Sequence, residues 1–165
     1  MKKIKVVIVE DQELVREGLH ILLNTEPDIE VIGTAGDGRA GVTMCQKLKP
    51  DIVLMDIHMP GMDGVVATGH IKKLYPEIKV IILTTYQEIS YVIEALSVGA
   101  EGYLLKAIQP KDLSAGIRLI HHGGTLIPPE MARGIVAELK ELKTLVKAPK
   151  EQRLYIHDLF QAGST

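Results

Sequence analysis

The sequence predicts an α/β fold in which helices cover both faces of a five-stranded parallel sheet. Five short apolar runs alternate with five segments of helical periodicity over roughly 120 residues. Strict alternation of this kind indicates parallel strands, because parallel neighbours must be joined by a crossover, usually a helix. The 165 residues leave room for one such domain and an additional element.

The first half of the pattern contains three strands and two helices. Residues 4–9 and 30–35 are short runs rich in β-branched residues, and residues 52–55 are apolar throughout, as in strands buried on both faces. Residues 12–23 carry leucine and valine at helical spacing. Residues 38–48 form the second helix, which a proline two positions further on stops.

The second half repeats the alternation. Residues 65–74 are expected to be helical and end before a tyrosine-proline pair, and residues 80–83 form the fourth strand. A helix at 88–98 ends at a glycine, and a short fifth strand follows at 103–105. The fifth helix, 110–121, has proline in its first turn and two glycines beyond its end.

A sixth helix is expected outside this count, at residues 130–146. Its apolar residues follow a 4-3-4 rhythm at Ile135, Leu139, Leu142 and Val146, with charged residues between them. A packing or linker helix is the favoured interpretation. A short dimerising coil is the alternative, although two heptads are too few to establish a coiled coil.

Composition indicates a cytoplasmic globular protein. Apolar residues make up 46% and charged residues 24%, and no apolar run approaches the ~20 residues of a membrane-spanning helix. Residues 1–5 lead directly into a strand, which argues against a secretory signal. Cys45 is the only cysteine, so an intramolecular disulfide is excluded. A net charge of -2 gives no whole-chain sign of nucleic-acid binding.

Polar side chains gather where the strands end. The residues that follow strands one, three, four and five are Glu10, Asp11, Asp56, Thr84, Thr85 and Lys106. Carboxyl ends of parallel strands meet at one edge of the sheet, and this edge is where such folds bind ligands. We therefore expect three carboxylates, a hydroxyl and a lysine to converge on one site.

This set of side chains suits phosphoryl transfer. Three nearby carboxylates repel one another unless a cation lies between them, and Mg²⁺ accepts a few carboxylate ligands while it keeps several waters. A lysine supplies a point charge for phosphate, and an aspartate is a competent phosphoryl acceptor. Each residue alone also has an ordinary structural interpretation as a helix cap, helix N-terminal charge or surface lysine. Their joint occurrence at four strand ends favours a site.

Four motifs in order resemble the receiver domain of bacterial two-component response regulators. They are Val-Glu-Asp at 9–11, Leu-Met-Asp-Ile-His-Met-Pro-Gly-Met-Asp-Gly at 54–64, Leu-Thr-Thr at 83–85 and Gly-Ala-Glu-Gly-Tyr-Leu-Leu-Lys at 99–106. The last motif and the stretch at 123–128 resemble the NarL/FixJ class, whose members usually carry a LuxR-type helix-turn-helix output domain. The resemblance implies a flavodoxin-like (βα)5 fold with strand order 2-1-3-4-5.

The resemblance also implies roles for individual residues. Asp56 would accept a phosphoryl group from a sensor histidine kinase. Glu10, Asp11 and Asp56 would hold Mg²⁺, together with the backbone carbonyl of His58. Lys106 would contact the phosphoryl oxygens.

A switch follows from the same resemblance. Thr84 would move its hydroxyl onto the phosphoryl group, and Tyr103 would turn into the vacated space. The phosphorylated chain would then form a homodimer, either through the first and fifth helices or through the fourth and fifth, and the tail helix could add area. His58, Thr85 and Tyr86 flank the site. Tyr86 is expected to exclude water and Thr85 to narrow the approach, which predicts a long-lived phosphoryl group; a neutral His58 imidazole acting as a base is the alternative. Ala107 follows Lys106 where many receivers have a cis proline, so the isomer of this peptide stays open.

The expected domain organisation follows from the same resemblance. We expect a receiver domain at 1–123 and a linker helix with a tail at 124–165. The 37 residues after Pro128 are too few for a helix-turn-helix domain of ~60 residues. DNA binding would therefore require an output domain absent from this chain, through truncation or, as the alternative, natural loss.

Two other functions compete with a signalling switch that is not a conventional enzyme. A Mg²⁺-dependent phosphatase of the haloacid-dehalogenase type would need a second aspartate two residues after Asp56, where this chain has His58. A degenerate receiver that works without phosphorylation is disfavoured by the full acidic set and Lys106. No membrane partner is expected.

Overall fold

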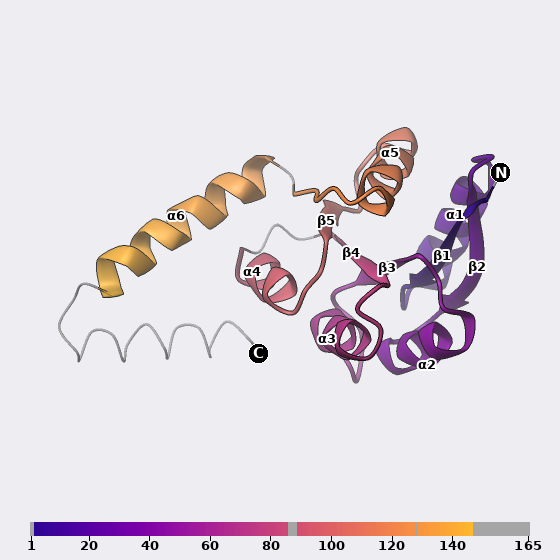
Figure 1. The fold of residues 1–165 in the computed structure, drawn as a ribbon, viewed down its shortest axis with the longest axis horizontal. Helices are drawn as coiled ribbons and strands as arrows, with labels where there is room; N and C mark the ends of the chain where they lie inside the picture. Colours follow the sequence, from indigo (N-terminus) through magenta and orange to yellow (C-terminus); the bar gives the residue numbers. More distant parts are fainter. Residues whose placement is uncertain (1, 86–88, 128, 147–165) are drawn as a thin grey trace.

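The computed structural model describes residues 2–85, 89–127 and 129–146, which form five strands and six helices (Figure 1). The strands are β1 (Ile4–Val9), β2 (Ile29–Ala35), β3 (Ile52–Asp56), β4 (Lys79–Thr84) and β5 (Gly102–Leu105). The helices are α1 (Glu13–Asn24), α2 (Gly38–Leu48), α3 (Gly64–Leu74), α4 (Ile89–Ser97), α5 (Pro110–His121) and α6 (Pro129–Val146). Each helix and strand in the described part of the chain begins and ends within one residue of the expected position.

The strands form one parallel sheet in the order β2-β1-β3-β4-β5. This is the flavodoxin-like order that the resemblance implied, and it is confirmed. β1, β3 and β4 are almost completely buried because helices cover both of their faces. The reversal of strand order between β1 and β3 brings the ends of these two strands together at the carboxyl edge, where doubly wound sheets hold their ligands.

Two apolar cores lie on opposite faces of the sheet. α1 and α5 cover one face and α2, α3 and α4 cover the other (Figure 1). Alternate residues of each strand enter alternate cores: in β1, Val6 and Ile8 pack with α1 and α5, while Val7 and Val9 pack with the other layer. The alternation fixes which face of the sheet each side chain enters.

α6 is an extension of this domain on the side of α4. The helix begins after the segment that follows α5, and it passes α4 (Figure 1). Ile135 packs against the core on the α4 side, whereas Val136 and Leu139 are about half exposed. α6 therefore packs against the domain through one side, and another part of its surface stays exposed.

Backbone details bear on two further expectations. Among the described residues no peptide bond is cis, so the bond between Lys106 and Ala107 is trans. Within the same residues, none of the helices combines the length and the apolarity needed to cross a membrane. The side chains of Asp37 and Asp63 accept hydrogen bonds from backbone N–H groups of α2 and α3 and cap those helices.

Candidate functional site

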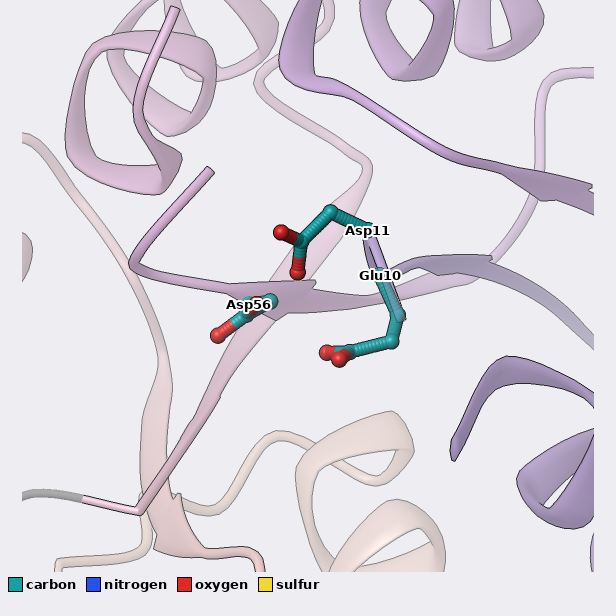
Figure 2. Close-up of side chains that lie close together, drawn as sticks. All are labelled: Glu10, Asp11 and Asp56. Atoms are coloured by element: carbon teal, nitrogen blue, oxygen red, sulfur yellow. The ribbon is translucent and has the colours of Figure 1, made fainter. Parts of the chain in front are cut away.

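Three carboxylates meet at the carboxyl edge of the sheet. Glu10 and Asp11 directly follow β1, and Asp56 is the last residue of β3 (Figure 2). One carboxylate oxygen from each residue lies within 4.8 Å of the others. Glu10 and Asp56 are only 2% and 5% exposed, whereas Asp11 is exposed to solvent. The cluster expected from the strand ends is therefore formed.

Lys106 completes the cluster from the end of β5. Its Nζ lies 2.8 Å from Glu10 Oε2, 2.9 Å from Glu10 Oε1 and 3.4 Å from Asp56 Oδ1. The backbone N–H of Lys106 donates to the Thr84 carbonyl at 2.7 Å, which fixes the lysine against the end of β4. The partly buried Lys106 ammonium thus bridges carboxylates from two strands and offsets part of their repulsion.

The electrostatics of Asp56 reflect this crowding. Burial and the neighbouring Glu10 carboxylate raise the pKa of Asp56 from its ordinary value of 3.8 to about 7, although Lys106 acts in the opposite direction. One lysine is therefore insufficient to stabilise all of the negative charge. A second cation at this position would remove the repulsion and hold Asp56 in its charged form.

The donor set fits Mg²⁺. All three side chains offer carboxylate oxygens, and the exposed Asp11 leaves one side of the cluster open to water. Mg²⁺ prefers oxygen ligands, uses few protein groups and keeps several waters. Glu10, Asp11 and Asp56 would hold the ion, and the backbone carbonyl of His58 remains a predicted fourth protein ligand.

The remaining predicted residues lie around this cluster in different environments. Thr84 ends β4 and is fully buried, as is Tyr103 in β5. Thr85 is exposed at the rim. The rings of His58 and of Tyr91 on α4 are nearly perpendicular, with 5.1 Å between their centroids. Tyr86 lies outside the described residues.

Arg16 is a site residue that the sequence analysis missed. Its Nη1 donates a hydrogen bond to the Glu10 carbonyl at 2.8 Å, from the first turns of α1. This contact ties the helix to the turn that carries Glu10 and Asp11. The available signal was an arginine one and a half turns beyond an acidic pair, a spacing that brings a long side chain back over the helix N-terminus.

The fold is that of a doubly wound α/β domain, and its polar cluster lies at the carboxyl edge of the sheet, where domains of this class hold their ligands. The chain belongs to the response regulator receiver domain family, whose model matches residues 6–118.

The similar proteins are response regulators of the LuxR type. The transcriptional regulatory protein LnrK of Bacillus subtilis is 41% identical over 86% of this chain and 64% of its own length. The response regulator protein VraR of Staphylococcus epidermidis is 38% identical over 97% of this chain and 77% of its own. A LuxR-family response regulator from Aurantimonas superposes with a TM-score of 0.78 and 31% identity, covering 83% of this chain and 98% of that one. The chain thus spans less than two thirds of LnrK.

Proposed function

We propose that this receiver domain is switched by transfer of a phosphoryl group from a sensor histidine kinase to Asp56, with Mg²⁺ as the cofactor. The observation that carries the proposal is the convergence of Glu10, Asp56 and Lys106 from three strands on one buried site. Membership of the response regulator family supports the same conclusion.

The chemistry assigns each side chain one task. A carboxylate oxygen of Asp56 forms a bond to phosphorus as the bond from phosphorus to the kinase imidazole nitrogen breaks, and the bonding electrons return to that nitrogen. Lys106 stabilises negative charge on the phosphoryl oxygens. Mg²⁺ would supply further positive charge when bound. Glu10 and Asp11 would hold that ion beside Asp56, so catalysis would depend on positioning and electrostatics.

The proposed readout runs through Thr84 and Tyr103. The Thr84 hydroxyl would hydrogen-bond to the new phosphoryl group and Tyr103 would fill the space beneath it, so that a local charge biases a two-state element. Both residues lie on neighbouring strands at the site edge, where Thr84 pairs with Leu105 and Ile82 with Tyr103. A change at the end of β4 therefore acts directly on β5.

Phosphorylation at Asp56 is the first test. Incubation with acetyl phosphate and Mg²⁺ should add one phosphoryl group to the intact chain, as measured by mass spectrometry, and Asp56→Asn should remove the labelling. Asp112→Asn changes an exposed aspartate in the first turn of α5 and serves as the matched control. Labelling of the Asp56→Asn chain at the level of the control would refute the assignment.

We further propose that phosphorylation drives homodimerisation through α1 and α5. Leu14 and Ile21 are 84% and 68% exposed, and their seven-residue spacing places both on one face of α1. Leu119 on α5 is also exposed. Large exposed apolar side chains that share a face are typical of an interaction surface.

Sedimentation should detect this dimer. We expect beryllofluoride with Mg²⁺ to convert a monomeric chain into a dimer at micromolar concentrations, and Ile21→Lys to prevent the conversion because it buries an unpaired charge. Leu48→Lys places the same charge on an exposed leucine of α2 and should have no effect. Equal dimerisation of the two variants would exclude α1 from the interface.

We propose that the receiver domain carries the switch and that DNA binding belongs to a separate output domain. Residues 1–123 would carry the phosphorylation site, and residues 124–165 would lead to a helix-turn-helix domain that binds DNA in the full-length protein. The names of LnrK, a transcriptional regulatory protein, and of the LuxR-family structure support this role.

A further inference from the structure

Residues 124–127 complete the outer edge of the sheet. Leu126 forms an isolated parallel bridge with Gly102 of β5. The Tyr103 N–H donates to the Leu126 carbonyl at 2.8 Å, and the Leu126 N–H donates to the Glu101 carbonyl at 3.4 Å. Without this segment the N–H and carbonyl groups of β5 would lie on an open strand edge. The segment that follows α5 therefore adds a short sixth element to the sheet beside β5, and it also connects α5 to α6.

The side chains of this segment enter both cores. Leu126 packs against the core formed with α1 and α5, and Ile127 packs against the core formed with α3 and α4. Gly116 on α5 leaves room for Leu126, because a Cβ at this position would lie 2.9 Å from Leu126 Cδ2. Gly123 (φ +95°) turns the chain from α5 towards the sheet. Side-chain packing and backbone pairing thus both hold residues 124–127 against the sheet.

The partner strand is itself anchored at this point. The Glu101 carboxylate pairs with Lys72 at the end of α3 and accepts a hydrogen bond from the Val80 N–H at 2.7 Å. The carbonyl of the same residue accepts the Leu126 N–H. The beginning of β5 is therefore held in place, and a displacement of β5 is expected farther along, at Tyr103.

Tyr103 connects this edge to the switch. Its side chain is fully buried between α4 and the sheet, while its backbone N–H bonds to Leu126. α6 begins only three residues after Leu126, at Pro129. Few rotatable bonds separate the proposed switch residue from the helix that leads to the output.

We infer that Leu126 is a positioning residue: it holds the Tyr103 backbone through β5 edge pairing and transmits the state of the switch to α6. This inference rests on the proposed function, because it takes Tyr103 as the switch. The alternative route runs through α4, which also contacts α6. The two routes differ in whether residues 126–127 must be rigidly joined to α6.

Two glycine insertions into the full chain distinguish the route through residues 126–127 from the route through α4. A Gly-Gly pair between Ile127 and Pro128 keeps the edge bridge and α6 but loosens the bond between them. The same pair between Gly123 and Gly124 lengthens the turn before the bridge and serves as the control. Amide hydrogen exchange with and without beryllofluoride and Mg²⁺ measures the response at Asp56, at Tyr103 and in α6 separately.

We expect beryllofluoride to change the exchange of α6 in the parent and in the control insertion, and this change to be lost in the 127/128 insertion while the response at Asp56 persists. An α6 response that survives the 127/128 insertion would overturn the inference in favour of the α4 route. Absence of an α6 response in a parent chain that responds at Asp56 would overturn the inference alone. Absence of any response at Asp56 would overturn the proposed function as well.

A side-chain pair tests the positioning role directly. Leu126→Asn places a polar group against the core and should accelerate exchange of the Tyr103 amide about tenfold, the effect of weakening one hydrogen bond. Leu126→Ile keeps the apolar contact and should exchange at the parent rate. Equal Tyr103 exchange in both variants would show that Leu126 does not hold β5, whatever its effect on the melting temperature.

Discussion

Replacing Lys106 with methionine is expected to lower the free energy of unfolding of the metal-free protein by about 3–5 kcal/mol at pH 8. Lys106 Nζ lies 2.8 Å from Glu10 Oε2 and 3.4 Å from Asp56 Oδ1, and both carboxyl groups are buried. Methionine fills a similar volume but carries no charge. The substitution therefore leaves two buried carboxylates beside each other without the cation that bridges them.

Urea unfolding in a chelator measures this loss. Lys111→Met removes an exposed lysine near the start of α5 and should change the free energy of unfolding by less than about 0.5 kcal/mol. Mg²⁺ should recover part of the stability of the Lys106→Met chain, because the ion supplies positive charge to the same carboxylates. A loss no larger than that of Lys111→Met would show that Lys106 does not stabilise the cluster.

Local sequence patterns predicted most of the sheet and its site for a physical reason. Each strand of a parallel sheet is a continuous apolar run, and each crossover has helical periodicity, so the element types can be read locally. The rule that carboxyl ends meet at one edge then placed Glu10, Asp56 and Lys106 together without any knowledge of distances. The geometry of the cluster follows from topology.

The features that the sequence did not reveal depend on contacts between distant segments. Residues 124–127 pair with β5 through a single bridge, and so short a segment has no periodicity that distinguishes a strand from a linker. The bond from Arg16 to the Glu10 carbonyl depends on how α1 is oriented after β1. The same holds for the contact between His58 and Tyr91, which joins the loop after β3 to α4.

Without metal, the free energy of unfolding is expected to decrease as the pH rises from 4 to 8. Burial and Glu10 raise the pKa of Asp56 from 3.8, its ordinary value in an unfolded chain, to about 7 in the folded protein. Between these two values the folded state keeps a proton that the unfolded chain has released. Stability from this group is therefore complete below pH 4 and is lost as the pH passes 7.

The size of the effect follows from the difference in proton affinity. Each tenfold difference corresponds to ~1.4 kcal/mol, so the loss across this range is on the order of 4 kcal/mol. Asp56→Asn removes the titrating group and should flatten this part of the profile. The variant should consequently be more stable than the parent at pH 8 in a chelator and of similar stability near pH 4.

With Mg²⁺ at pH 8, the parent should instead be more stable than Asp56→Asn. An ion held by the charged carboxylate should stabilise the parent at pH 8 and should stabilise Asp56→Asn much less, since one ligand would be lost. Chemical unfolding at several pH values, with chelator or with Mg²⁺, measures all four cases. Asp112→Asn removes an exposed carboxylate and should follow the parent in each of them. Parallel pH profiles for the parent and Asp56→Asn in chelator would show that Asp56 is not the group that titrates between pH 4 and 8.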